Sequence, residues 1–367
     1  MNRFTELPTS GHERVVSCHD HATGLRAIIA VHDTTLGPAL GGLRMWDYVS
    51  EDEALFDVLR LARGMTLKSA AAGLNFGGGK AVILGNSRMQ KSVALLRSFG
   101  QFVNELGGKY ITAEDMGIGT HDIETIREVT PHVAGLADRS GDPSPFTALG
   151  VFVGIKAALK RATGSEEVSG RRVLVQGTGQ VGLALVQHLR GAGADVLAFD
   201  VNESSLGAAV AAGARALSAE EVYAAPVDVY VPCALGATLN PATIPQLRCA
   251  VVCGAANNQL LDEERDGRAL HDRGILYAPD FVVNAGGIIN IAVEKEGDYD
   301  PERARRLTEN IYQTVTDIFA ACDTRRILPQ QAAIRLAERR LHRAGPGGES
   351  HAAVPALGMN PHHEVLR

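Results

Sequence analysis

The chain has 367 residues, a length typical of about two or three domains. Its composition is 45% hydrophobic and 21% charged, which is ordinary for a globular protein, and its net charge of −6 without a long basic run argues against binding to nucleic acid or anionic membranes. The first ten residues lack the apolar core of a signal peptide and no apolar run of about 18 residues occurs, so we expect a cytoplasmic protein without a membrane span.

The first third of the chain alternates predicted strands and helices. The segments VVSCHD and LRAIIAVHD are predicted strands, and GPALGG, residues 37–42, is predicted to be a loop. Ser50 followed by Glu53 is typical of a helix start, and apolar residues at helical spacing extend this helix to about Lys68. The alternation predicts an α/β domain over residues 1–145.

Three further elements complete this predicted domain. KAVILG is predicted to be a short buried strand, residues 88–106 a helix, and KYITAEDMG a strand that ends in a polar turn. The stretch SGDPSPFTALG, residues 140–150, is rich in Pro, Gly and Ser. It is therefore predicted to be a hinge between two domains.

The second half begins with a predicted helix over residues 147–162 and continues as a second α/β unit over residues 146–327. Its later predicted strands are DVLAFD, VDVYVPC, CAVVCGAA and ILYAPDFVVN. Helices are predicted over residues 301–322 and 328–343, the second returning toward the first domain, and residues 344–367 have no periodic pattern and are predicted to be a loose tail.

A glycine pattern opens the second unit. VLVQGTGQVG places Gly177, Gly179 and Gly182 in the order G-x-G-x-x-G between an apolar strand and a helix, where the backbone approaches a pyrophosphate closely and the helix N-terminus stabilises it. Asp200 ends the next strand, where a carboxylate accepts hydrogen bonds from ribose hydroxyls and repels a 2′-phosphate. The pattern predicts a Rossmann domain that binds NAD rather than NADP, with a cofactor-free Rossmann domain as the alternative.

Two lysines, Lys68 and Lys80, flank a loop of alanines, glycines and apolar residues. Burial among apolar groups lowers the pKa of a lysine, so one of the pair would serve as a general base while the other binds an anionic substrate group. Asp115 follows a predicted strand, and a carboxylate beside these lysines would bind an ammonium group. Two solvated lysines and an aspartate that caps a helix are the alternatives.

Eight segments in order resemble the amino acid dehydrogenases of the glutamate, leucine, phenylalanine and valine type, and come nearest to the leucine dehydrogenase branch of that family. The resemblance as a whole covers about residues 12–325. The segments are LGPALGGLRMW, ARGMTLKSAAAGLNFGGGKAVI, YITAEDMG, SGDPSPFTALGV, VQGTGQVG, VPCALGATLN, GAANNQL and YAPDFVVNAGGIINIA. The resemblance implies an α/β protein of two domains, with an N-terminal substrate and assembly domain, a Rossmann domain, and a cleft between them. It also implies oxidative deamination of an L-amino acid with reduction of NAD(P), by a homo-oligomer; the preference for NAD rests on Asp200.

The resemblance assigns a role to each candidate residue. Lys68 matches the lysine that binds the substrate carboxylate, Lys80 the general base that activates water, and Asp115 the carboxylate that holds the amino group and exchanges protons with it. The residues that match those on the nicotinamide side or in contact with substrate are Thr147, Asn257 and Asn284.

The preferred substrate is predicted from two positions. Glutamate enzymes of the family carry a lysine where Leu40 stands and a serine where Ile291 stands, so a charged substrate side chain would be buried unpaired here. The resemblance therefore implies leucine, valine or isoleucine as substrate, with an aromatic amino acid such as phenylalanine as the alternative. The side-chain pocket would be formed by Leu40, Ala113, Ile288 and Ile291, and Gly41 and Gly42 are also expected to bind substrate.

Cysteines and histidines add no further site. The five cysteines are odd in number and contain no C-x-x-C, which favours reduced thiols. Histidines lie close together in SCHDHATG, beside Cys18, and in NPHHEV, but neither segment has the spacing of a metal site, so no metal is expected.

Overall fold

The computed structural model describes residues 3–8 and 11–345. The predicted loose tail therefore lies almost entirely outside the described residues. Contacts divide the described chain into two compact units: unit 1 holds the residues up to Asp142, Ile291–Asp300 and those from Ala337 onward, and unit 2 holds Pro143–Asn290 and Pro301–Leu336. Among the described residues, no helix is long and apolar enough to cross a membrane.

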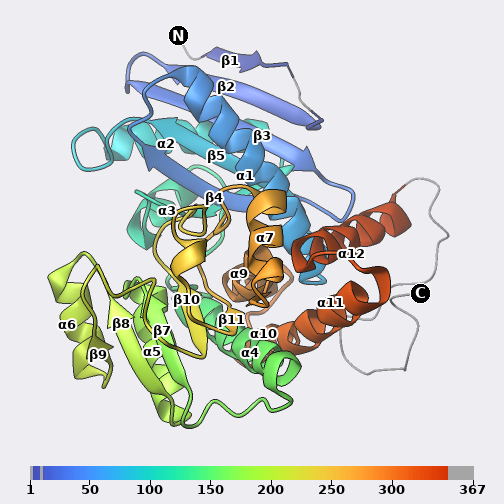
Figure 1. Cartoon of the computed structure of the whole chain (residues 1–367). Coiled ribbons are helices and arrows are strands. Elements are labelled where there is room, and N and C mark those ends of the chain that lie inside the picture. The colour runs from blue at the N-terminus through green and yellow to red at the C-terminus, as the bar shows by residue number, and fades with distance from the viewer. Residues whose placement is uncertain (1–2, 9–10, 346–367) are drawn as a thin grey trace. The chain divides into compact units, whose positions relative to one another are not determined.

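Unit 1 is built on a six-stranded sheet in the order β1-β2-β3-β5-β4-β6 (Figure 1). The pairs β1–β2, β2–β3 and β3–β5 are antiparallel, whereas β4 is parallel to both β5 and β6. The strands are β1 Arg3–Glu6, β2 Arg14–Asp20, β3 Leu25–Asp33, β4 Ala39–Trp46, β5 Gly77–Leu84 and β6 Tyr110–Glu114. The helices are α1 Glu51–Ala71, α2 Val93–Glu105 and α3 Thr120–Arg127.

The predicted loop over residues 37–42 is wrong, because residues from Ala39 onward belong to β4. Glycine has little preference for strands, so the sequence pattern points away from one. Here the missing side chain is what the sheet requires: a Cβ on Gly41 would lie 1.8 Å from the carbonyl oxygen of Gly79 on β5. Close backbone approach explains glycine in this strand.

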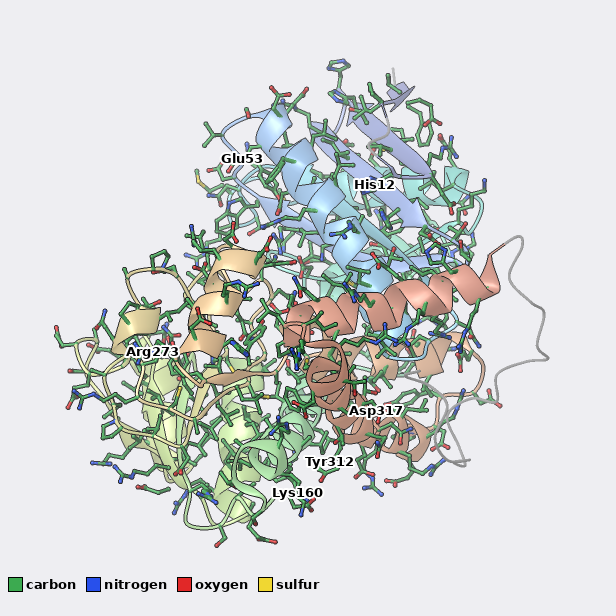
Figure 2. The ribbon with its side chains drawn as sticks, turned by 45° about the vertical axis from the view of Figure 1, so that its right-hand side comes forward. His12, Glu53, Lys160, Arg273, Tyr312 and Asp317 are labelled. Atoms are coloured by element: carbon green, nitrogen blue, oxygen red, sulfur yellow. The ribbon has the colours of Figure 1, made fainter. Side chains whose placement is uncertain are left out.

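Helix α1 covers one face of this sheet. It begins as predicted, with the Ser50 hydroxyl accepting from the Glu53 backbone N–H at 3.1 Å, and Glu53, labelled in Figure 2, accepts in turn from the Val49 N–H at 2.7 Å. Its inward face contributes to a core cluster with the sheet residues Val15, Ile28, Ala30 and Val82. Helices α2 and α3 pack in the core on the other face.

Unit 2 contains six parallel strands in the order β9-β8-β7-β10-β11-β12. The chain steps outward from β7 to β9 and then resumes on the other side of β7, which makes the edge between β7 and β10 the topological switch point of a Rossmann fold. The strands are β7 Arg172–Gln176, β8 Asp195–Phe199, β9 Arg215–Ala216, β10 Val229–Pro232, β11 Val251–Val252 and β12 Leu276–Tyr277. Together with unit 1, this confirms the predicted α/β fold of two domains.

The helices of unit 2 begin with α4 Ser144–Thr163, three residues earlier than predicted, because Pro143 and Pro145 suit the first turn of a helix. It continues with α5 Gln180–Gly191, α6 Glu203–Ala211, α7 Glu263–Asp272, α8 Asp280–Val283, α10 Pro301–Glu309 and α11 Ile311–Arg325. The single helix predicted over residues 301–322 is therefore two, separated at Asn310, whose φ of −64° is still that of a helix.

The predicted strand ILYAPDFVVN is mostly wrong, because only Leu276 and Tyr277 pair in the sheet and Asp280–Val283 form α8. Pro279 has no N–H for a sheet ladder, and a short apolar run does not distinguish a strand from a buried helix. Likewise, only Val251–Val252 of CAVVCGAA are a strand.

Two segments late in the chain anchor within unit 1. Helix α9, Gly286–Lys295, was not predicted, and near its end the buried Glu294 carboxylate accepts from the backbone N–H groups of Gly135, Leu136 and Ser140 at 3.1–3.3 Å. In α12, Pro329–Ala344, the Arg340 guanidinium donates to the Asn75 side chain at 3.0 Å and to carbonyls at the end of α1.

Candidate active site

One face of the unit 1 sheet carries several of the predicted site residues. Side chains alternate along a strand, and the registers of β4 with β5 and β6 place Leu40, Gly42 and Arg44 on the same face as Lys80 and Ala113. This is the face that α1 covers. Leu40 and Ala113 are both buried.

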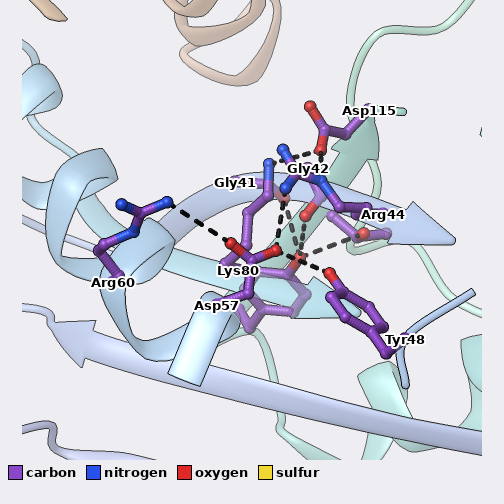
Figure 3. Close-up of polar contacts among 10 residues, drawn as sticks. Gly41, Gly42, Arg44, Tyr48, Asp57, Arg60, Lys80 and Asp115 are labelled. Carbon is purple, nitrogen blue, oxygen red and sulfur yellow. Dashed lines mark hydrogen bonds and ion pairs between the residues drawn. The ribbon is translucent and has the colours of Figure 1, made fainter. Parts of the chain in front are cut away.

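Lys80 and Asp115 form an ion pair on this face, with Lys80 Nζ 3.1 Å from Asp115 Oδ2 (Figure 3). Lys80 is only 5% exposed, whereas the Asp115 side chain is 25% exposed and presents the more open half of the pair. The absence of a side chain at Gly42 leaves space for this pair, because a Cβ there would lie 2.8 Å from Asp115 Cβ and 3.2 Å from Lys80 Nζ. Gly41 accepts a hydrogen bond from the Tyr110 hydroxyl at 2.8 Å. Asp115 is not the cap of the following helix, which begins after Gly119.

Three residues that the sequence analysis did not single out complete the arrangement. Arg44 donates from Nε to Asp115 Oδ2 at 3.0 Å and from a terminal nitrogen to Asp57 Oδ2 at 2.9 Å, and the Tyr48 hydroxyl donates to Asp57 at 2.7 Å (Figure 3). A local signal existed: Arg44 stands two residues after Gly42 and so shares its face of the strand. We refer to Tyr48, Asp57, Arg44, Asp115 and Lys80 as the polar chain.

The pKa shifts of the central pair have opposite physical origins. Burial lowers the pKa of Lys80, and the nearby charge of Arg44 lowers it further, against the opposing effect of Asp115. Burial alone would raise the pKa of Asp115, but the charges of Lys80 and Arg44 outweigh it and the net shift is downward. The arrangement therefore favours an ionised carboxylate beside a lysine that can lose its proton.

Lys68 lies half-buried in the last turn of α1. That end of the helix packs tightly on β5, where a Cβ on Gly78 would lie 2.0 Å from the backbone nitrogen of Thr66. Glycine at this position therefore allows the helix that carries Lys68 to approach the strand that carries Lys80.

The glycine-rich loop of unit 2 follows β7 at the switch point. Gly177 has a φ of +95°, and a Cβ there would lie 2.6 Å from the backbone nitrogen of Ala234, at the end of β10. A Cβ on Gly182 would lie 1.9 Å from the Gly177 carbonyl oxygen, whereas Gly179, at the start of α5, faces open space. Two glycines thus allow the tight turn, and the third leaves a helix N-terminus accessible to a phosphate group.

Asp200 stands at the end of β8, next to this loop. Its Oδ2 accepts from the Thr178 backbone N–H at 2.6 Å, and its Oδ1 accepts from the Asn202 N–H at 2.8 Å. The half-buried carboxylate thus holds the glycine-rich loop and also places a negative charge at the position where a ribose would bind.

A second group of predicted residues gathers in unit 2. Asn284 Nδ2 donates to Asn257 Oδ1 at 2.8 Å and to the Ala255 carbonyl at 3.0 Å, while its buried Oδ1 has no hydrogen-bond partner. A Cβ on Gly287 would lie 2.7 Å from the Thr147 hydroxyl oxygen. A buried acceptor without a donor is costly, and a polar ligand would satisfy it, so these residues fit a bound dinucleotide or substrate.

Ile288 and Ile291 both lie in α9 and are 7% and 8% exposed. Ile288 belongs to unit 2 and Ile291 to unit 1. Of the four residues predicted to form the pocket, Leu40, Ala113 and Ile291 therefore lie in unit 1, and Ile288 lies in unit 2.

No second reactive centre stands out among the described residues. All five thiols are buried or half-buried, and burial raises the pKa of each, to about 12 for Cys233, Cys249 and Cys322. Within residues 3–8 and 11–345, no group of three or more His, Cys, Asp or Glu side chains is arranged to hold a metal.

A Rossmann unit with a glycine-rich loop at its switch point, joined to an α/β unit that buries a lysine–carboxylate pair, is the architecture of a dehydrogenase that uses a nicotinamide dinucleotide. The chain belongs to the glutamate, leucine, phenylalanine and valine dehydrogenase family. The family model of the dimerisation domain matches residues 12–132, and that of the Glutamate/Leucine/Phenylalanine/Valine dehydrogenase matches residues 140–206 and 199–345. The predicted resemblance is confirmed, and the protein is an amino acid dehydrogenase.

Named relatives cover almost the whole chain. Leucine dehydrogenase of Geobacillus stearothermophilus is 49% identical over 100% of this chain and 99% of its own. Phenylalanine dehydrogenase of Caldalkalibacillus thermarum is 43% identical over 94% of this chain and 95% of its own. The crystal structure of L-tryptophan dehydrogenase from Nostoc punctiforme superimposes with a TM-score of 0.79 at 43% identity, covering 91% of this chain and 96% of that one.

Proposed function

We propose that the protein catalyses the reversible, NAD-dependent oxidation of leucine, valine or isoleucine to the 2-oxo acid, ammonia and NADH. The observation that carries this proposal is the buried Lys80 paired with Asp115 on the sheet face that also holds Leu40. A base beside a carboxylate suits the handling of an amino group, and an apolar residue at position 40 suits an aliphatic side chain.

Residues of unit 1 would bind and activate the amino acid. Lys68, kept charged, binds the substrate carboxylate, and Asp115 accepts hydrogen bonds from the substrate ammonium group. Neutral Lys80 then takes a proton from the water that attacks the iminium carbon. Its lowered pKa supports this role, because a lysine that is neutral near the working pH is an efficient base.

Residues of unit 2 would hold the dinucleotide. Gly177, Gly179 and Gly182 admit the pyrophosphate to the start of α5, and Asp200 accepts from the adenosine ribose hydroxyls. A dinucleotide held there would supply the acceptor for the hydride that leaves the substrate Cα. The negative charge of Asp200 supports NAD as the dinucleotide over NADP.

A second candidate is the same reaction on an aromatic amino acid. The relatives named phenylalanine and tryptophan dehydrogenase, with 43–45% identity to this chain, support it. The buried Ala113 methyl group supports an aliphatic substrate instead, although one methyl group discriminates by only about 1–3 kcal/mol.

The test is the initial rate of NADH formation with each of the twenty L-amino acids at alkaline pH. We expect kcat/KM to be highest for leucine, valine or isoleucine and lowest for glutamate. Highest kcat/KM for phenylalanine or tryptophan would establish the second candidate. Oxidation of glutamate alone, or of no amino acid, would contradict the proposal.

We also propose that the protein works as a homo-oligomer. The family model of unit 1 is described as a dimerisation domain, and a structural neighbour at 25% identity is a hetero-hexameric glutamate dehydrogenase. Light scattering coupled to size-exclusion chromatography would give the mass in solution, and a mass near the 38.9 kDa of one chain would contradict assembly.

A further inference from the structure

We propose that Arg44 is a positioning residue for the reaction: held by Asp57 and Tyr48, it fixes the Asp115 carboxylate so that one oxygen is engaged within the protein and the other is presented to the substrate amino group. The inference rests on the proposed function, since it takes Asp115 to be the group that meets the amino group.

The geometry of the guanidinium is the first argument. Arg44 contacts Asp115 through Nε and Asp57 through a terminal nitrogen, at 3.0 and 2.9 Å. Because the guanidinium is planar, it cannot rotate without losing one of these hydrogen bonds. The Arg44 side chain is 18% exposed and that of Asp57 is 16% exposed, so both contacts are largely shielded from water.

Asp57 is itself held in place. It lies on α1 and accepts at Oδ2 from both Arg44 and the Tyr48 hydroxyl, whereas the exposed Arg60 approaches its other oxygen only to 4.0 Å. The polar chain thus runs from the helix, through Arg44, to the reacting pair on the sheet (Figure 3). Arg60 lies at its outer end and provides a matched control.

The two oxygens of Asp115 are used differently. Within the described residues, Arg44 and Lys80 both contact Oδ2, and the hydrogen bonds of this carboxylate leave Oδ1 uncommitted. With a side chain that is 25% exposed, Oδ1 is the atom available to an incoming ammonium group. Removing Arg44 would free the carboxylate to turn.

The charges around Lys80 and Asp115 predict a pH dependence that distinguishes the proposal from a merely structural role of Arg44. Burial is the main cause that lowers the pKa of Lys80. The charge of Arg44 lowers this pKa further, whereas the charges of Asp115 and Asp57 raise it. Burial is the main cause that raises the pKa of Tyr110 and of Glu114, and the charge of Asp115 raises both further. Removal of Arg44 and removal of Asp57 should therefore shift the pH dependence of the lysine in opposite directions.

The experiment compares Arg44→Met, Arg44→Lys and Asp57→Asn with Arg60→Met as control. Since a misplaced catalytic group can cost about 100-fold, we expect kcat for the best amino acid to fall by about that factor in Arg44→Met. The acid limb of kcat/KM against pH should move upward in Arg44→Met, return toward the wild-type position in Arg44→Lys, and move downward in Asp57→Asn. Arg60→Met should leave both kcat and the profile unchanged.

Two outcomes would overturn the proposal. The first is that the wild type is active and that Arg44→Met changes neither kcat nor the pH profile. The second is that the acid limb shifts in the same direction in Arg44→Met and in Asp57→Asn, as a general loosening of the site would give. Where Arg44→Met does not fold, Arg44→Lys and Asp57→Asn carry the test. A wild type that oxidises no amino acid would instead contradict the proposed function. In that case a double-mutant cycle between Arg44 and Asp115, measured by urea unfolding, decides: additive effects would rule out the contact.

Discussion

At the scale of single residues, the site depends on a lysine held almost fully out of water. Lys80 is 5% exposed and its pKa is lowered, chiefly by burial. A lysine whose pKa in the folded protein lies below its ordinary value loses its proton at a lower pH. The rate of amino acid oxidation should therefore rise with pH and level off below about 10.4, the ordinary lysine pKa.

Lys80→Ala tests this assignment. Because general bases contribute about 10²–10⁴-fold, we expect kcat to fall within that range while dinucleotide binding, measured by fluorescence titration, persists. A small primary amine such as ethylamine should restore part of the rate in proportion to its neutral form. Lys160→Ala is a suitable control, since Lys160 is exposed in the last turn of α4 in unit 2. Unchanged kcat in Lys80→Ala would rule out the base.

At the scale of elements, glycines decide how closely α1, β4 and β5 approach one another. Gly41→Ala would place a methyl carbon 1.8 Å from the Gly79 carbonyl oxygen, so we expect a protein that does not fold stably. Gly64→Ala is the matched control, because Gly64 lies inside α1 and a Cβ there meets nothing within 4 Å.

For Gly64→Ala we expect the free energy of unfolding to rise by about 0.5–1 kcal/mol, since alanine loses less backbone freedom than glycine in a helix. Urea denaturation followed by circular dichroism would measure both variants. A Gly41→Ala protein as stable as wild type would show that the strands can separate to admit a methyl group.

The elements also show what the sequence could predict. The start of α1 follows from Ser50 and Glu53 because a cap is a local feature, and β7 with its glycine-rich loop follows from a pattern of ten residues. Strand β4 could not be predicted at Gly41 and Gly42, because the residues that require glycine there lie on β5 and at the end of β6, far along the chain.

The candidate site likewise contains some residues that could be predicted from the sequence and others that could not. Lys68, Lys80 and Asp115 were singled out from short segments, and Lys80 and Asp115 lie together. Arg44 and Asp57 were missed because their contacts span 71 and 13 residues along the chain. The strand pattern could have placed Arg44 on the face of Gly42, but it could not have identified the partners of Arg44. Chemistry that resides in short motifs is predictable from sequence, whereas the groups that orient it depend on the fold.

At the scale of the whole molecule, each unit has its own core, and the proposed function gives each unit its own ligand. Binding of NAD to unit 2 should raise the free energy of unfolding by about 2.7 kcal/mol at a concentration 100 times Kd. Hydrogen exchange should slow chiefly around β7, the glycine-rich loop and the start of α5. NADP should have a weaker effect, because Asp200 would repel its 2′-phosphate.

Asp200→Asn separates the two roles of this side chain. Asparagine carries no charge, and its single oxygen can still accept from the Thr178 N–H, although the contact with the Asn202 N–H is then lost. The glycine-rich loop should therefore stay in place while the difference in affinity between NAD and NADP narrows. Calorimetry of both ligands with both proteins would measure this. Equal stabilisation of the wild type by NAD and NADP would contradict the assignment of Asp200.

The state of the five thiols has a practical consequence for following motion in this enzyme. All are buried or half-buried with a raised pKa, so at neutral pH they react slowly with maleimides. A cysteine introduced at an exposed position such as Val49, which is 94% exposed, would react first. A fluorescent dye can thus be attached at one chosen point while every native cysteine remains in place.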